Sequence, residues 1–190
     1  ASIIGGAGYT AGELIRLLVN HPGVEIVSVH SSSNAGKKLT DVHTGLYGDT
    51  EMLFDETPVL VGVDVVFLCT PHGKSSEFLV ENEIGEDVRI IDLSQDFRDE
   101  SNGFVYGLPE LNRNRISGAA RIANPGCFAT AIQLALLPAV KAGIIEGDAE
   151  VTAITGSTGA GVKPSATTHF SYRNSCLLYT SPSPRDGLLS

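Results

Sequence analysis

Strand-like and helix-like segments alternate along residues 2–93 of the chain. Four short runs dominated by Val, Ile and Leu are typical of buried strands and lie at residues 2–4, 24–30, 64–69 and 88–93. Between these runs, residues 13–19 and 75–82 carry apolar side chains at helical spacing. This alternation predicts an α/β fold, a doubly wound Rossmann-type parallel sheet with helices on both faces.

The pattern changes after residue 106. Residues 112–120 are expected to form a loop, and a helix is predicted from Cys127 to about residue 142, where Gly143 ends it. Residues 150–155 read as a strand that opens a second fold unit. We therefore expect one α/β domain over residues 1–126 and the beginning of a second domain over residues 127–174.

Both ends of the sequence differ from the rest. The chain begins without Met inside an apolar strand, so we expect a few residues to precede it. Residues 175–190 show neither helical nor alternating periodicity and resemble translated adapter sequence, which favours a non-native tail. A genuine Pro/Ser-rich tail is the alternative. With a non-native tail, the chain corresponds to the front part of a longer protein.

Composition narrows the possible partners. The 190 residues include 13 Lys and Arg against 22 Asp and Glu, a net charge of −9, which repels phosphate backbones and anionic lipid. Nucleic acid and membrane are therefore not expected as partners, and no apolar run reaches the roughly 18 residues of a spanning helix. Three unclustered cysteines, Cys69, Cys127 and Cys176, favour the reducing cytoplasm over a disulfide framework.

The first strand runs into a glycine-rich turn and then a helix. The spacing Gly5-x-x-Gly8-x-x-Ala11 allows the backbone to approach a pyrophosphate, whose charge is favourable at a helix N-terminus. A tight turn without a ligand explains the glycines equally well, but the position at the first strand–helix junction favours a dinucleotide. The expected cofactor-binding residues are Gly5, Gly6, Ala7, Gly8, Tyr9, Thr10 and Ala11.

The end of the second strand bears on the choice between NAD and NADP. A carboxylate there would bind the ribose of NAD, but Glu25 lies at the beginning of that strand. Ser31, Ser33 and Lys37 follow its end, with Lys38 beside them, and hydroxyls and cations suit a 2′-phosphate. We therefore expect NADP, the alternative being an ordinary polar loop.

Thr70, Pro71 and His72 follow the third strand, where α/β sheets bind ligands. We expect these three residues to line the cofactor cleft. A role for His72 as a general base is the less favoured interpretation.

Cys127 is the candidate nucleophile. The preceding Asn-Pro-Gly turn places its thiol at a helix N-terminus, where the helix dipole stabilises the reactive thiolate. A small buried apolar residue is the alternative, and we assume that role for Cys69 at a strand end.

Four residues are candidates for substrate binding: Arg98, Asn124, Ser157 and Gly159. Arg98 can bind a carboxylate in bidentate fashion, or it can pair with Asp96 or Asp99. The Gly156–Gly161 stretch offers backbone donors to an anion, or is only a mobile loop. No metal site is expected.

Seven motifs occur in order: GGAGYTAGEL at 5–14, SNAGKK at 33–38, CTPHG at 69–73, DLSQDFR at 92–98, YGLPEL at 106–111, NPGCFAT at 124–130 and GSTGAG at 156–161. Together they resemble the N-acetyl-gamma-glutamyl-phosphate reductase family of arginine biosynthesis, over residues 1 to about 174. The resemblance implies an NADP-binding Rossmann domain and pyrophosphate binding by the Gly5–Ala11 turn. It also implies a nucleophilic Cys127 and a homo-oligomer. Residues 127–174 would then be the incomplete beginning of an α+β catalytic and dimerisation domain.

The chemistry implied by the resemblance is the NADPH-dependent reduction of an acyl phosphate, a small-molecule substrate, through a thioester on Cys127. Two features depart from the family. Ser32 stands where many members have Arg, and the His-x-His-x-Pro-Glu segment with the catalytic His does not occur, since His169 does not match it. We therefore expect the 190-residue chain alone to be inactive.

Two alternatives remain open. The first is a related enzyme, either aspartate-semialdehyde dehydrogenase or a lysine-pathway acyl-phosphate reductase. The second is a non-catalytic nucleotide-binding module.

Overall fold

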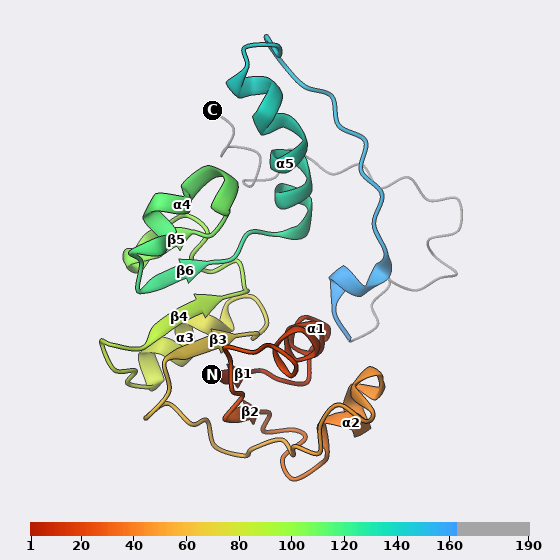
Figure 1. Cartoon of the computed structure of the whole chain (residues 1–190), viewed down its shortest axis with the longest axis vertical. Helices are drawn as coiled ribbons and strands as arrows, with labels where there is room; N and C mark the ends of the chain where they lie inside the picture. The colour runs from red at the N-terminus through yellow and green to blue at the C-terminus, as the bar shows by residue number, and fades with distance from the viewer. Residues whose placement is uncertain (163–190) are drawn as a thin grey trace. The chain divides into compact units, whose positions relative to one another are not determined.

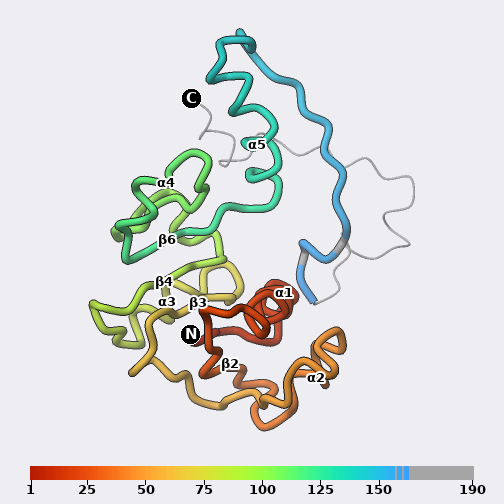
Figure 2. Tube along the Cα trace, viewed as in Figure 1, coloured from red at the N-terminus to blue at the C-terminus, as the bar shows by residue number. Residues whose placement is uncertain are grey.

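The computed structural model describes residues 1–162 (Figures 1 and 2). The chain divides into two compact units, Ala1–Pro125 and Gly126–Ser190, and the second is described as far as residue 162. The expected tail over residues 175–190 lies outside the described residues, as do His169 and Cys176.

In the described part of the chain, the first unit holds a six-stranded sheet in which every neighbouring pair of strands is parallel. The strands are β1 (Ser2–Ile4), β2 (Ser28–His30), β3 (Val65–Leu68), β4 (Arg89–Asp92), β5 (Val105–Tyr106) and β6 (Arg121–Ala123). Their order is β2-β1-β3-β4-β6-β5, so β2 and β3 lie on opposite sides of β1. The predicted parallel Rossmann-type sheet is confirmed.

The sheet is covered on both faces because successive side chains of a strand point to opposite sides. Ile3 packs with Ala11 and Ile15 of α1 (Tyr9–Leu18) in one buried cluster. Its neighbour Ile4 belongs to a second buried cluster, against which Phe78 of α3 (Lys74–Glu81) packs. α1 and α3 therefore cover opposite faces of the sheet (Figure 1).

All three predicted helices are present. α3 lies within one residue of its predicted bounds, and α5 (Cys127–Lys141) begins at the predicted residue. α1 begins at Tyr9, four residues before the apolar periodicity. The periodicity does not reveal this first turn because Tyr9 and Thr10 are exposed. The predicted stop after α5 is also present, since Gly143 adopts a φ of +66°.

The loop expected over residues 112–120 was wrong in part, because α4 (Pro109–Ser117) extends through most of it. The helix begins with proline at its first position, which suits a helix start, but its sequence has no continuous apolar stripe. The flanking strands β5 and β6 are two and three residues long and too short to show a period.

The remaining short helices were not predicted either. They are α2 (Leu39–Val42) and the 3₁₀ turns η1 (Thr44–Leu46), η2 (Ser101–Gly103) and η3 (Ser157–Ala160).

The strand predicted over residues 150–155 is also wrong. These residues have no regular structure, and Ile154 is 96% exposed. Within residues 126–162 there is no strand for them to pair with, and an unpaired strand is not stable in water.

The predicted strand over residues 24–30 is shorter in the structure. Only Ser28–His30 form β2, because the neighbouring strand β1 begins at Ser2, which pairs with Ser28.

Candidate functional site

The carboxyl ends of β1, β2 and β3 meet at the point where the strand order reverses, which is where α/β sheets bind ligands. The N–H of Gly6, just after β1, donates to the carbonyl of His30 at the end of β2 over 2.8 Å. On the other side, the N–H of Cys69 after β3 donates to the carbonyl of Ile4 over 2.8 Å. The structure therefore brings together the three segments that carry the expected cofactor-binding residues.

The turn after β1 needs glycine at two successive positions. Gly5 has a φ of +77°, and a Cβ placed there would lie 2.7 Å from the carbonyl oxygen of Cys69. A Cβ on Gly6 would lie 2.3 Å from the Cγ1 of Val29. Both glycines are thus explained by close packing against the neighbouring strands.

The start of α1 fits an anionic group. Gly8 is the N-cap, no side chain caps the helix, and no acidic residue lies in its first turn. The N–H groups at the start of a helix lack acceptors within the helix and carry a partial positive charge. Tyr9 and Thr10 are exposed there, whereas Ala11 is fully buried against the sheet. The turn can therefore cradle a phosphate, as a dinucleotide requires.

The polar residues after β2 form a hydrogen-bonded group. The side-chain amide of Asn34 donates to the hydroxyls of Ser31 and Ser33 over 3.4 and 3.1 Å. The Oδ1 of the same amide accepts from the Nζ of Lys37 over 3.2 Å. Lys38 instead pairs with the Glu51 carboxylate over 2.6 Å. Lys37 donates to a neutral amide, whereas Lys38 already pairs with a carboxylate, so Lys37 is the better candidate of the two for binding an added anion.

The residues after β3 are held by their neighbours. The hydroxyls of Thr70 and Ser75 lie 2.7 Å apart, and the Nδ1 of His72 accepts from the N–H of Gln95 over 3.1 Å. The carbonyl of Pro71 accepts from the N–H of Lys74 as α3 begins. This segment is therefore tied to both α3 and the loop after β4.

Two carboxylates, Asp92 and Asp96, hold these loops, and the sequence analysis assigned neither of them this role. Asp92 is fully buried at the end of β4 and accepts from the hydroxyls of Ser75 and Ser94 over 2.5 and 2.8 Å. Asp96 accepts from the N–H groups of Gly73 and Ser76 over 2.6 and 3.1 Å. Burial opposes ionisation of Asp96, but these hydrogen bonds outweigh it and lower its pKa. An Asp that ends an apolar strand was the available signal for Asp92.

Two of the expected substrate-binding residues are in contact. The Nε of Arg98 donates to the carbonyl of Asn124 over 2.9 Å, and its Nη2 donates to the carbonyl of Leu93 over 3.2 Å. The amide of Asn124 donates to the carbonyl of Pro125 over 3.1 Å. Arg98 thus links the loops that follow β4 and β6.

The second unit holds the candidate nucleophile. Cys127 is the first residue of α5 and is exposed, and Gly126 caps the helix with a carbonyl that accepts from the N–H of Thr130 over 2.8 Å. Ser157 and Gly159 lie in η3 of the same unit.

Cys69 is in a different state, because burial and the nearby Asp92 carboxylate raise the pKa of its thiol to about 12. Its thiol is therefore protonated at neutral pH, whereas thiolate is the form in which a cysteine acts as a nucleophile.

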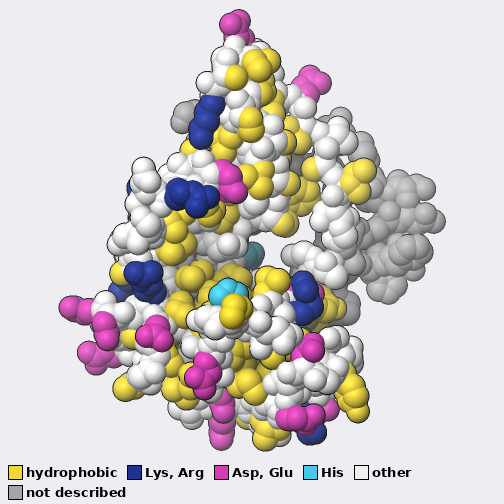
Figure 3. Space-filling model, in the orientation of Figure 1, with side chains coloured by type: hydrophobic (Ala, Val, Ile, Leu, Met, Phe, Trp, Pro, Cys, Tyr) yellow, Lys and Arg dark blue, Asp and Glu magenta, His cyan; other side chains and the backbone are white. Residues whose placement is uncertain are grey.

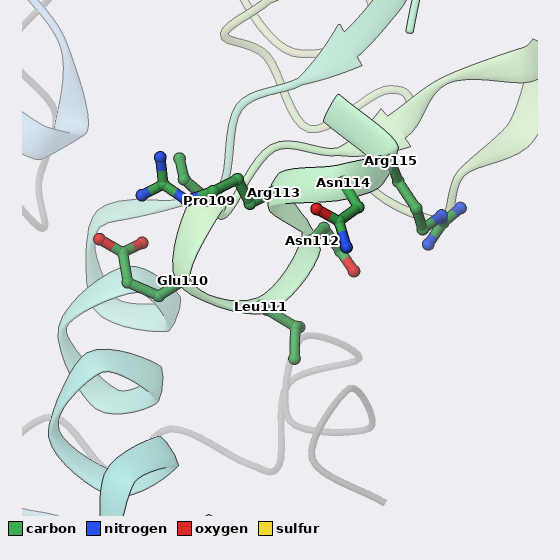
Figure 4. Close-up of a pocket in the computed structure, with 7 residues that line it drawn as sticks. All are labelled: Pro109, Glu110, Leu111, Asn112, Arg113, Asn114 and Arg115. Atoms are coloured by element: carbon green, nitrogen blue, oxygen red, sulfur yellow. The ribbon is translucent and has the colours of Figure 1, made fainter. Parts of the chain in front are cut away.

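A surface hollow of about 410 Å³ follows α4 and is lined by Pro109, Glu110, Leu111, Asn112, Arg113, Asn114 and Arg115 (Figure 4). The labelled side chains point outward in different directions around the helix, and they do not converge on one point. Ligand sites need converging polar groups. α4 also contacts β5 at the far edge of the sheet from β1.

Neither a membrane span nor a metal centre occurs among the described residues. None of their helices is long and apolar enough to cross a membrane. The same residues contain no group of three His, Cys, Asp or Glu side chains placed to hold a metal ion.

Comparison with known families gives two matches. Residues 1–119 match the semialdehyde dehydrogenase NAD-binding domain, and residues 127–181 match the semialdehyde dehydrogenase dimerisation domain. The first match indicates a nicotinamide cofactor.

Curated relatives are named N-acetyl-gamma-glutamyl-phosphate reductase. The protein from Bacteroides thetaiotaomicron is 60% identical over 176 residues, which cover 92% of this chain and 55% of that protein. The protein from Parabacteroides distasonis is 60% identical over 174 residues, 90% of this chain and 54% of that protein. The chain thus spans about half the length of the curated relatives it matches.

Among solved structures, aspartate semialdehyde dehydrogenase II from Vibrio cholerae, described as a complex with ASA, is similar with a TM-score of 0.54. Its sequence is 20% identical, and the match covers 74% of this chain and 45% of that chain. This likeness supports the fold.

Proposed function

The chain belongs to the semialdehyde dehydrogenase family, and from that premise we propose that its protein reduces N-acetyl-gamma-glutamyl phosphate with NADPH, giving N-acetylglutamate semialdehyde and phosphate. The glycine-rich turn of residues 5–11, called the cradle below, lies where the strand order of the sheet reverses, and it carries the proposal. It offers the close backbone approach and the free helix N-terminus that the pyrophosphate of a dinucleotide needs. The substrate is taken from relatives that share about 60% of the aligned residues.

The cofactor would be held by residues of the first unit. The backbone of residues 5–11 receives the pyrophosphate, and Thr70, Pro71 and His72 line the cleft at the end of β3. When bound, the nicotinamide supplies the hydride. The protein contributes the positions of these groups and the positive end of α1.

NADP is favoured over NAD by the residues after β2. Ser31, Ser33 and Lys37 form one hydrogen-bonded group with Asn34 there. Glu25 precedes β2 by three residues, so its carboxylate is at the wrong end of the strand to bind a ribose. A lysine and two hydroxyls can bind the 2′-phosphate of NADP, whereas a carboxylate would repel it.

Cys127 is the nucleophile in this proposal. Its thiolate attacks the acyl carbon of the substrate, the bond from that carbon to the phosphate oxygen breaks, and inorganic phosphate leaves. The product of this step is a thioester on Cys127. Its reduction, with the hydride that the nicotinamide would supply, would break the bond between the acyl carbon and the sulfur, release the semialdehyde and return Cys127 to the thiolate. Exposure at the first turn of α5 supports this role. Arg98, Asn124, Ser157 and Gly159 are proposed to bind the substrate.

The protein is also proposed to act as a homo-oligomer in the cytoplasm. Phe128, Leu134 and Val140 of α5 are 39%, 41% and 52% exposed, and apolar side chains are visible along this helix in Figure 3. Apolar side chains exposed on a helix suit burial in an interface.

The two domains are proposed to span residues 1–126 and 127–174. The family matches support this division, because one ends at residue 119 and the other begins at residue 127.

The activity can be tested in a chimaera. Residues 1–174 replace the matching segment of the Bacteroides thetaiotaomicron relative, and NADPH consumption is followed with N-acetyl-gamma-glutamyl phosphate or aspartyl phosphate. The acetylated substrate is expected to react at least about tenfold faster, as a site built to hydrogen-bond one substrate discriminates strongly. A chimaera that prefers aspartyl phosphate, while the unaltered relative does not, contradicts the proposed substrate.

The cofactor preference can be tested on the chain of 190 residues. Titration followed by cofactor fluorescence is expected to give a Kd for NADPH about tenfold below that for NADH, from one charge-assisted contact. Lys37→Gln should remove most of the difference. Lys38→Gln is the matched control and should keep it, because Glu51 already neutralises Lys38. Equal or tighter binding of NADH by the wild-type chain counts against NADP.

A further inference from the structure

His43 connects the segment between β2 and β3 to the glycine turn. The residue ends α2 in the long connection that forms the orange-to-yellow part of the tube in Figure 2. Its Nε2 lies 2.6 Å from the carbonyl oxygen of Gly6, and its ring centroid lies 6.1 Å from that of Phe54. A carbonyl can only accept, so the Nε2–H of His43 donates this hydrogen bond.

The ring of His43 also explains a glycine inside α1. A Cβ on Gly12 would lie 2.5 Å from the Nδ1 and 2.9 Å from the Cε1 of His43. Glycine is a poor helix residue compared with alanine, so its place in the middle of α1 needs a reason. The close approach of the imidazole to the helix backbone supplies that reason.

The hydrogen bond from His43 fixes one peptide of the cradle. The N–H of Gly6 is held by His30, and its carbonyl is held by His43, so both sides of the residue are anchored. A trans peptide points its carbonyl and the next N–H in opposite directions. The N–H of Ala7 is therefore turned away from the imidazole. Gly6 has no Cβ, so without this bond the peptide rotates easily.

We propose that His43 is a positioning residue for cofactor binding, which holds the Gly6–Ala7 peptide so that the Ala7 N–H faces the pyrophosphate. This inference rests on the proposed function, because it assigns His43 to the same nucleotide site. His43 touches the turn and not the reacting atoms. Its contribution is to affinity for the pyrophosphate part of the cofactor.

The test compares two substitutions of His43 in the chain of 190 residues. His43→Phe keeps a ring against Gly12 but removes the donor, and it is expected to raise the Kd for NADPH about fivefold, the effect of losing one hydrogen bond. His43→Gln keeps an N–H donor and should restore most of the affinity. His21→Phe is the matched control, because the His21 ring also bonds a backbone group, the N–H of Gly23, but follows the end of α1.

A second ligand separates positioning from general damage to the fold. Adenosine 2′-phosphate lacks the pyrophosphate, so its Kd should be the same for wild type and His43→Phe. A parallel loss for both ligands means that the substitution acts on the fold as a whole and overturns the proposal. Equal affinity of wild type and His43→Phe for NADPH also overturns it.

Gly12→Ala provides an independent check through the same contact. The added methyl displaces the imidazole and is expected to weaken NADPH binding in the wild-type background. In a His43→Ala background the same change should have no further effect, because contacting residues are not additive. Additive losses contradict the proposal. If the wild-type chain binds neither NADPH nor NADH, the proposed function itself fails, which is a different result from failure of the His43 variants alone.

Discussion

Replacing Cys127 by serine is expected to lower acyl-phosphate reduction by about 10³-fold or more, the scale of losing a covalent nucleophile. Serine keeps the geometry of the helix start, since the cap is formed by the Gly126 carbonyl and the Thr130 N–H and not by the Cys127 side chain. Its hydroxyl is much less nucleophilic than a thiolate, so the thioester does not form.

The measurement uses the chimaera that contains residues 1–174. Turnover should be lost in Cys127→Ser while the Kd for NADPH stays within about twofold, because the cradle residues belong to the other unit. Iodoacetamide provides a control in the unsubstituted chimaera: loss of activity should follow alkylation of Cys127 and not of Cys69, whose thiol is protonated. Substantial turnover by the serine variant removes Cys127 from the covalent role.

The central part of the sheet could be predicted from the sequence because its strands are buried and rich in β-branched residues. β1 and β3 contribute side chains to the buried clusters on both faces of the sheet, so apolar residues follow one another at Ile3 and Ile4 and along Val65–Leu68. β4 carries two successive isoleucines, of which Ile90 is buried. β5 and β6 are held mainly by pairing with each other and with β4, and this pairing leaves no local signal in two or three residues. Residues 150–155 show the reverse case, a strand-like sequence for which residues 126–162 contain no partner strand.

The candidate site also contains residues that the sequence reveals and residues that it does not. The glycine turn is readable because its conformational demands are local: Gly5 needs a positive φ, and Gly8 and the start of α1 follow at fixed spacing. The carboxylate of Asp92 and the imidazole of His43 act through contacts 17 and 37 residues away in the sequence. The strand end marks Asp92 as a candidate, but nothing in the sequence near either residue marks its partner, so only the folded structure reveals the contacts.

Arg98 makes backbone contacts that the sequence does not reveal. Two expectations were a substrate carboxylate and an ion pair with Asp96 or Asp99. In the structure the guanidinium donates to two backbone carbonyls, and such a fork is held in a fixed orientation. A guanidinium held in a fixed orientation is consistent with the proposed substrate role.

Gly5 and Gly62 offer a comparison between two glycines of similar conformation. Their φ angles are +77° and +72°. A Cβ on Gly62 would meet no atom within 4 Å, whereas one on Gly5 would meet backbone atoms of Cys69 and Thr70 at 2.7 to 3.1 Å. Alanine at Gly62 therefore costs only the left-handed backbone penalty of about 1–2 kcal/mol. Alanine at Gly5 adds a steric conflict with backbone that cannot move without separating β1 from β3.

Gly5→Ala is accordingly expected to lower the free energy of unfolding of the first unit by about 3–5 kcal/mol, a large part of the stability of a typical domain. Urea unfolding followed by far-UV circular dichroism measures this change, with Gly62→Ala as the matched control. Any Gly5→Ala chain that remains folded should bind NADPH at least about tenfold more weakly, since the cradle is displaced from its place against β3. Equal effects of the two substitutions on stability, together with unchanged NADPH affinity, contradict the view that close packing of Gly5 on the end of β3 builds the nucleotide site.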